Sequence, residues 1–123
     1  LTEGEYCTVI GIFQSQRKNN EALTITGDGE QRRDFTHVDD IVDGFIKTGI
    51  DLIKNNNSKA NGEIFELGRG KNYSINEVAN MFGGRKIYIS ENKGEVRNTL
   101  CTDIKAKTLL NWNPKRDLKD YIN

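Results

Sequence analysis

The chain has 123 residues, with 18 lysines and arginines against 18 aspartates and glutamates, and a mean hydropathy of -0.68. This length fits one domain, and the balanced charge provides no field that would attract nucleic acid or an anionic membrane. No apolar run approaches the roughly 20 residues that a membrane-spanning helix needs. Cys7 and Cys101, the only cysteines, lie far apart and outside any zinc-binding spacing. They predict free thiols in a reducing cytoplasm and no metal site.

Two elements are predicted before the first glycine-rich turn. Apolar residues at helical spacing predict an amphipathic helix over residues 5–18. Leu23 and Ile25 alternate with threonines, which predicts a short strand. The Gly-Asp-Gly sequence at residues 27–29 is typical of a turn.

A long helix is predicted after a second extended segment. Phe35 and Val38 are expected in that segment, and Asp39 or Asp40 can cap the helix that follows. Its apolar stripe continues to Ile53, beyond which a polar Asn-Asn-Asn-Ser loop ends it.

The second half of the chain alternates predicted strands and helices. Residues 63–68 carry apolar side chains on both faces, which predicts a strand inside a parallel sheet. Ser74 and Glu77 have the spacing of a capping box at the start of a helix. The remaining predicted elements are a strand at Ile87 and Ile89, a helix capped by Asp103 that runs through Trp112, and a last helical turn after Asp117. These elements predict an α/β fold, and the lack of partners for strand 63–68 predicts that the chain is part of a longer protein.

Motifs of dinucleotide chemistry are incomplete. Residues 68–73, Gly-Arg-Gly-Lys-Asn-Tyr, lack the third glycine of a dinucleotide loop, which favours a strand exit followed by a helix cap. None of the four tyrosines has a lysine four positions later. His37, the only histidine, is predicted to be structural, so no catalytic or cofactor-binding residue is expected here.

Arg32 and Arg33 are candidates for anion binding. Neighbouring side chains on a strand point to opposite faces, so these two guanidinium groups cannot both serve one site. A guanidinium beside a glycine-rich turn suits a phosphate, since its fork of N–H donors matches two phosphate oxygens. From the residues alone, a solvated surface arginine remains the alternative.

Three segments carry a family resemblance. "LTITGDGEQRRDFTHVDDIVDGF" resembles the C-terminal substrate-binding part of nucleotide-sugar epimerases and dehydratases, which are extended short-chain dehydrogenases/reductases that include UDP-glucose 4-epimerase. "EIFELGRGKNYSINEVANMFG" is similar to the family's late strand and helix, and "KGEVRNTLCTDIKAKTLLNWNPKRDLKDYI" to its tail. The resemblance implies that residues 1–123 form a small mixed α/β substrate-binding domain that lacks most of the Rossmann domain.

The resemblance implies roles for residues near the glycine-rich turn. Arg33 matches the family's diphosphate-binding arginine, so Arg32 should face away. Thr24 and Thr26 match a strand that lines the base and ribose pocket, although the family often has an aromatic residue at the position of Thr26.

The tail departs from the family's Arg-x-Gly-Asp pattern. The acid near the ribose is matched by Glu95, but Asn92 stands where the family has a diphosphate-binding arginine. Lys93 or Arg97 would have to offset that loss, and Arg97 is included among the expected substrate-binding residues.

The implied function is that of an NAD-dependent nucleotide-sugar epimerase acting on a UDP-linked sugar. NAD would bind to an N-terminal Rossmann part that this chain lacks, so the chain alone is expected to be inactive. The uncovered apolar faces of residues 63–68 predict a homo-oligomer. Alternatives are a 4,6-dehydratase, a non-catalytic nucleotide-sugar-binding module and an interaction domain without a small ligand.

Overall fold

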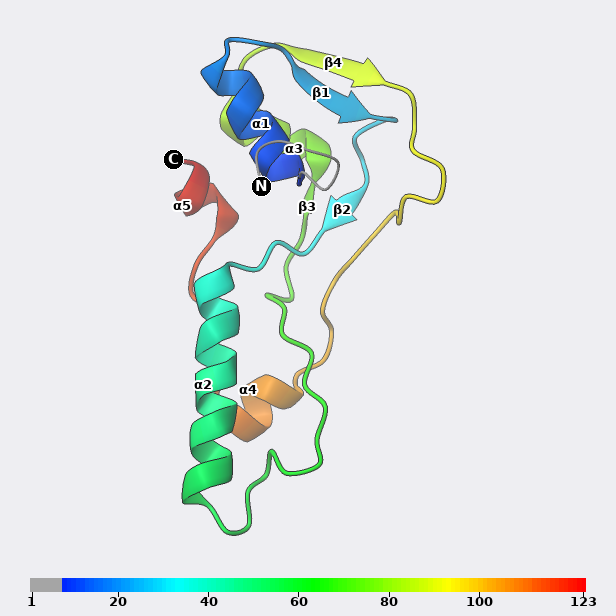
Figure 1. Ribbon diagram of the computed structural model, residues 1–123. Helices are drawn as coiled ribbons and strands as arrows, with labels where there is room; N and C mark the ends of the chain where they lie inside the picture. The colour runs from blue at the N-terminus through cyan, green and yellow to red at the C-terminus, as the bar shows by residue number, and fades with distance from the viewer. Residues whose placement is uncertain (1–7) are drawn as a thin grey trace. The chain divides into compact units, whose positions relative to one another are not determined.

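The structure is a computed structural model that describes residues 8–123, in which the chain forms two compact units (Figure 1). The described residues of the first unit are 8–33 and 73–98 with Ile122, and those of the second are 34–72 and 99–121 with Asn123. Both units contain helices, and the first also contains the strands, so the mixed α/β architecture predicted from the sequence is confirmed. Cys7 and the start of the helix expected at residue 5 lie outside the described residues.

The first unit combines short strands with two helices. Its elements are α1 (Val9–Lys18), β1 (Leu23–Thr26), β2 (Arg32–Arg33), β3 (Tyr73–Ser74), α3 (Ile75–Phe82) and β4 (Lys86–Ile89). β1 pairs in parallel with β4, and β2 pairs antiparallel with β3. Figure 1 shows β1 and β4 as adjacent arrows, with α1 and α3 side by side.

The core of this unit follows from the alternation along β1. Leu23 and Ile25 are fully buried, whereas the intervening threonines are half-buried, as expected for a strand with one face against helices. Phe13 of α1 is also fully buried and meets Phe82 of α3 edge to face, with ring centroids 5.7 Å apart. Apolar burial therefore fixes the strand face that carries Thr24 and Thr26.

The predicted capping box begins α3. Ser74 Oγ accepts a hydrogen bond from the backbone N–H of Glu77 at 3.0 Å, and Glu77 Oε2 accepts one from the N–H of Ser74 at 2.7 Å. The helix ends at Phe82, and the φ of 71° of its C-cap, Gly83, lies in the left-handed region that favours glycine. Both ends of α3 thus follow from the sequence.

The second unit is built around a long helix. Its helices are α2 (Val38–Lys54), α4 (Lys105–Leu110) and α5 (Leu118–Ile122). The last residue of α5, Ile122, belongs to the first unit. Its core comprises Ala60, Ala106, Leu110 and Trp112, with Phe65 and Leu67 packed against them. None of the helices in residues 8–123 is long and apolar enough to cross a membrane.

The strand predicted over residues 63–68 is not formed, which corrects that expectation. A strand requires a neighbouring strand to complete its ladder of backbone hydrogen bonds, and these residues have no such neighbour among the described ones. The carbonyl of Ile64 instead accepts a hydrogen bond from Lys105 Nζ at 3.1 Å. The alternation persists, since Phe65 and Leu67 are half-buried and Ile64 is 81% exposed.

The start of α2 also differs from the prediction. Phe35 lies outside any strand, Val38 is the first helical residue, and His37 rather than Asp39 or Asp40 is the N-cap. His37 Nδ1 accepts a hydrogen bond from the N–H of Asp39 at 3.1 Å. This agrees with a structural role for His37, whose ring also packs edge to face on Tyr121.

The helix predicted from Asp103 through Trp112 is shorter than expected. Its N-cap is Ile104 and not Asp103 as predicted, although Asp103 Oδ1 accepts a hydrogen bond from the N–H of Lys105, the first residue of α4, at 2.8 Å. The helix ends at Leu110 because Asn111 is left-handed, with φ 53°, so Trp112 lies beyond it. At the last predicted turn, Asp117 caps α5 as expected.

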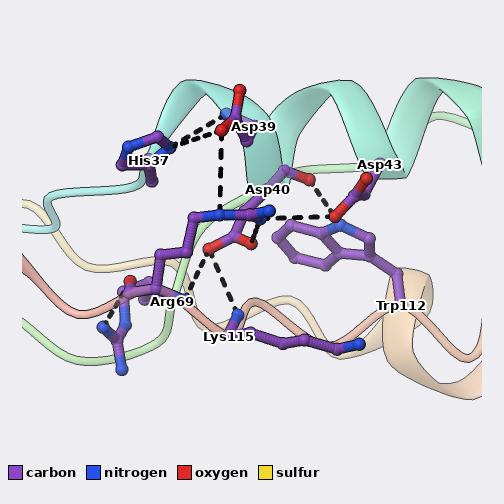
Figure 2. A network of polar contacts seen from close by, with 8 residues as sticks. His37, Asp39, Asp40, Asp43, Arg69, Trp112 and Lys115 are labelled. Carbon is purple, nitrogen blue, oxygen red and sulfur yellow. Dashed lines mark hydrogen bonds and ion pairs between the residues drawn. The ribbon is translucent and has the colours of Figure 1, made fainter.

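The side chain of Asp40 is buried within the second unit and does not cap α2 (Figure 2). Its side chain is 1% exposed and accepts hydrogen bonds from the N–H groups of Lys115 and Arg116 and from the Arg116 guanidinium. Its backbone carbonyl accepts one from Trp112 Nε1 at 2.7 Å. Burial alone would raise the pKa of Asp40, but these donors hold it below its ordinary value. Asp40 therefore joins the start of α2 to Trp112 through its carbonyl and to Lys115 and Arg116 through its carboxylate.

Candidate functional site

The two adjacent arginines of β2 contact different carboxylates. Arg32 Nη2 lies 3.1 Å from Glu77 Oε2 of α3, and Arg33 Nη2 lies 3.5 Å from Glu95 Oε1. This separation agrees with the alternation of side chains on a strand. Arg33 is directed toward the segment that follows β4, which carries three of the other expected binding residues, Asn92, Glu95 and Arg97.

Glu95 gathers three side chains of the first unit. Besides Arg33, its carboxylate accepts a hydrogen bond from Thr26 Oγ1 at 3.2 Å and lies 3.4 Å from Gln31 Nε2. Gln31 Nε2 also donates to the carbonyl and the hydroxyl of Thr26, at 3.0 and 3.2 Å. The end of β1 and the loop after β4 are thereby joined through polar side chains that can also bond a ligand.

A hollow of about 130 Å³ opens beside this network. It is lined by Thr26, Gly27, Asp28, Gln31, Glu91, Glu95 and Arg97. Three of these lining residues, Thr26, Glu95 and Arg97, are expected from the sequence to contact the substrate. No three or more His, Cys, Asp or Glu side chains of residues 8–123 are arranged to hold a metal ion.

Arg97 is held at the hollow by Asp28. Its two terminal nitrogens, Nη1 and Nη2, donate to Asp28 Oδ1 and Oδ2, both at 2.8 Å. The Arg97 guanidinium, followed by the N–H of Glu30, lowers the pKa of Asp28 to about 2. This is a two-pronged contact, whereas Arg33 meets Glu95 through one nitrogen at a longer distance.

Two expected residues have other local partners. Thr24 exchanges hydrogen bonds with the side-chain amide of Gln16 on α1, since Gln16 Nε2 donates to its hydroxyl at 2.8 Å and Gln16 Oε1 accepts from its N–H at 3.1 Å. The carbonyl of Asn92 accepts a hydrogen bond from the N–H of Glu95 at 3.2 Å. Asn92 therefore supports the turn that presents Glu95.

Gln31 and Asp28 were missed by the sequence reasoning. Gln31 is 4% exposed, and its carbonyl accepts a hydrogen bond from the N–H of Ile75 at the start of α3. One signal was available, because Gln31 stands two positions before Arg33 and alternation puts such residues on one face. No such pattern identified Asp28, which had been assigned to turn chemistry.

Larger hollows lie in the second unit, but their linings are less specific. One of about 530 Å³ is bordered by the end of α2, by polar residues that follow it and by Leu109. One of about 350 Å³ is bordered by residues 68–71, 101–104, 106–107 and 112–114. Neither contains a residue that the sequence assigns to the substrate. The hollow beside Glu95 is therefore the candidate site.

The sequence matches known enzymes over most of its length. It is 37% identical over 107 residues to the UDP-glucuronate 4-epimerase of Thermodesulfobacterium geofontis, an alignment that covers 81% of this chain and 31% of that relative. Residues 2–68, more than half of the chain, match the NAD dependent epimerase/dehydratase family. The chain thus spans about a third of the length of the curated relatives it matches.

Solved structures agree with this match. A UDP-glucose 4-epimerase from Thermotoga maritima with UDP-glucose superposes with a TM-score of 0.84 at 27% identity, covering 99% of this chain and 38% of that one. A UDP-glucuronic acid 4-epimerase from Bacillus cereus, in complex with UDP-glucuronic acid and NAD, gives a TM-score of 0.80 at 27% identity, covering 94% and 37%. Sequence and structure together show that the chain belongs to the NAD dependent epimerase/dehydratase family.

Proposed function

We propose that this chain supplies the nucleotide-sugar-binding region of an NAD-dependent nucleotide-sugar epimerase, with Arg33 on the diphosphate. The observation that carries the proposal is the gathering of Arg33, Thr26 and Gln31 around the Glu95 carboxylate beside a hollow. Relatives of this chain include epimerases whose structures hold UDP-sugars, which supports a ligand of that class.

The single contact between Arg33 and Glu95 would allow a ligand to replace Glu95 as the partner of Arg33. Its side chain is 25% exposed and meets Glu95 through one nitrogen at 3.5 Å, while Nη1 donates to the carbonyl of Arg32. A diphosphate offers a guanidinium shorter and stronger charge-assisted bonds than this single contact. Arg33 would therefore leave Glu95 for the ligand.

Glu95 and the threonines of β1 would then serve the uncharged parts of the nucleotide. A carboxylate held by Thr26 and Gln31 keeps lone pairs that can accept hydrogen bonds from ribose hydroxyls. Thr24 lies on the same strand face as Thr26, near the expected base pocket. Arg97 lines the hollow and would supply positive charge where Asn92 cannot.

Residues 68–73, whose sequence partly matches a dinucleotide loop, are not arranged to bind the diphosphate of NAD. A dinucleotide loop binds phosphate through free backbone N–H groups. In the loop at residues 68–73, the N–H groups of Arg69 and Gly70 already donate to the Asp34 carboxylate, both at 3.0 Å. We therefore propose that NAD, where it supports hydride transfer, binds through other parts of the family's fold, and that the chain alone does not catalyse epimerisation.

The proposal is tested by calorimetric titration of UDP into the wild-type chain and the Arg33→Ala variant. Saturable binding that weakens on substitution supports it, because Arg33 contributes charge-assisted hydrogen bonds to phosphate. Undetectable UDP binding by the wild type, or equal affinity of the two proteins, would contradict it.

A further inference from the structure

At the candidate site, Arg97 binds a carboxylate of the protein itself, that of Asp28. Both residues line the hollow of about 130 Å³, and the two carboxylate oxygens each accept one hydrogen bond from the guanidinium at 2.8 Å. A guanidinium meets a phosphate with the same fork of parallel N–H donors. Asp28 therefore occupies the donor pair that a diphosphate in this hollow would use.

The turn around Asp28 presents its carboxylate in a fixed position. Gly27 and Gly29, with φ of 63° and 74°, permit the turn, and the carbonyl of Asp28 accepts a hydrogen bond from Asn76 Nδ2 at 2.9 Å. Asp28 Oδ1 also accepts from the N–H of Glu30 at 2.9 Å. The carboxylate is thus held by its own turn before Arg97 contacts it.

Both members of the Asp28–Arg97 ion pair stay charged near neutral pH. The lowered pKa of Asp28 keeps its carboxylate charged at every pH well above about 2. Competition with a ligand is therefore set by geometry and charge, and not by protonation near neutrality.

We propose that Asp28 competes with the diphosphate for Arg97: it holds this arginine when no nucleotide is bound and so limits the affinity for the nucleotide. The inference rests on the proposed function and deepens it. In it, the affinity of that site is limited by a residue that does not itself bind the ligand. An anion must break the two Asp28 contacts before it gains Arg97, whereas it displaces one longer contact to gain Arg33.

The test measures UDP binding by calorimetry in Asp28→Asn and in the matched control Glu30→Gln. Asparagine keeps Oδ1, which accepts from Glu30 N–H, so the turn is retained. It removes the negative charge and the Oδ2 acceptor of Arg97 Nη2, so the hold on Arg97 is weakened. Glu30→Gln removes the same charge two residues away, from a carboxylate whose bond from Asn76 Nδ2 glutamine can keep. We expect Asp28→Asn to tighten UDP binding about threefold to tenfold and Glu30→Gln to change it less than about twofold.

A double variant connects the gain to Arg97. In Asp28→Asn/Arg97→Ala, the tightening should disappear, because the guanidinium that Asp28 competes for is no longer present. An unchanged or weaker affinity in Asp28→Asn, with wild-type binding that depends on Arg33, would overturn this inference alone. Tightening that survives in the double variant would also overturn it, and absence of UDP binding in the wild type would overturn the proposed function as well.

Discussion

Arg32 and Arg33 are adjacent in the sequence but contact carboxylates on different elements. Arg32 Nη2 lies 3.1 Å from Glu77 in the capping box of α3, and Arg33 Nη2 lies 3.5 Å from Glu95 in the loop after β4. Glu77 is already committed to the start of its helix, so Arg32 belongs to the scaffold. Glu95 borders a hollow, so we expect Arg33, which contacts Glu95, to be the arginine that meets a ligand.

This difference predicts unequal effects of two matched substitutions. Arg33→Ala should weaken UDP binding roughly tenfold to a hundredfold, because charge-assisted hydrogen bonds are each worth about 1.5–3 kcal/mol. Arg32→Ala should change it less than about threefold, since Arg32 pairs away from the hollow. Calorimetric Kd values for both variants provide the comparison. Equal losses, or a larger loss for Arg32→Ala, would reject the placement of the diphosphate.

Asp40 predicts a pH dependence of stability. Because its pKa in the folded chain is lowered, its contribution is present above its unfolded pKa of about 4 and is lost as the pH falls through the lower folded value. Asp40→Asn should therefore reduce the free energy of unfolding by roughly 1.5–3 kcal/mol at pH 7. The difference from wild type should shrink below about pH 4.

Urea unfolding at a series of pH values measures that difference. Asp120→Asn is the control, because Asp120 is an exposed residue of the same unit and its substitution should change stability by less than about 0.5 kcal/mol. A wild-type advantage over Asp40→Asn that stays constant from pH 7 to pH 3 would contradict the assignment.

Local patterns predicted the elements whose partners are near in sequence. The capping box of Ser74 and Glu77 and the inward face of Leu23 and Ile25 depend on neighbours within one helix or strand, and both were predicted. Residues 63–68 have the alternation of a strand but lack a neighbouring strand among the described residues. Periodicity reports which side chains are buried, whereas a ladder depends on another segment.

The candidate site shows the same limit. The resemblance identified Arg33, Thr26 and Glu95, which the structure brings together through Glu95. The Asp28–Arg97 contact joins residues 69 positions apart, and no local pattern reports such a pairing. Asp40 was expected in a helix cap because Asp is a frequent N-cap, but its burial and its contacts with Arg116 decided otherwise.

The apolar surface of α2 predicts self-association. Phe45, Ile46 and Ile53 are 70%, 53% and 86% exposed, and such side chains on one helix favour contact with another apolar surface. We expect a dimer or larger species in sedimentation at about 100 μM, a concentration at which contacts with Kd of about 1–100 μM are populated. Phe45→Ser/Ile53→Ser should shift the chain toward monomer, whereas Lys54→Ser should not. A wild-type monomer at that concentration would contradict the prediction.

Two glycines of α2 predict opposite effects of the same substitution. Alanine in a helix interior is normally more stable than glycine by about 0.5–1 kcal/mol, and a Cβ at Gly49 would meet nothing within 4 Å. A Cβ at buried Gly44 would lie 2.6 Å from Leu67 Cδ1 and 3.2 Å from Trp112 Nε1. Gly49→Ala should therefore stabilise the chain, and Gly44→Ala should cost roughly 1–3 kcal/mol through overpacking. Urea unfolding of both variants decides, and a stabilised Gly44→Ala would show that Leu67 and Trp112 do not pack on this face.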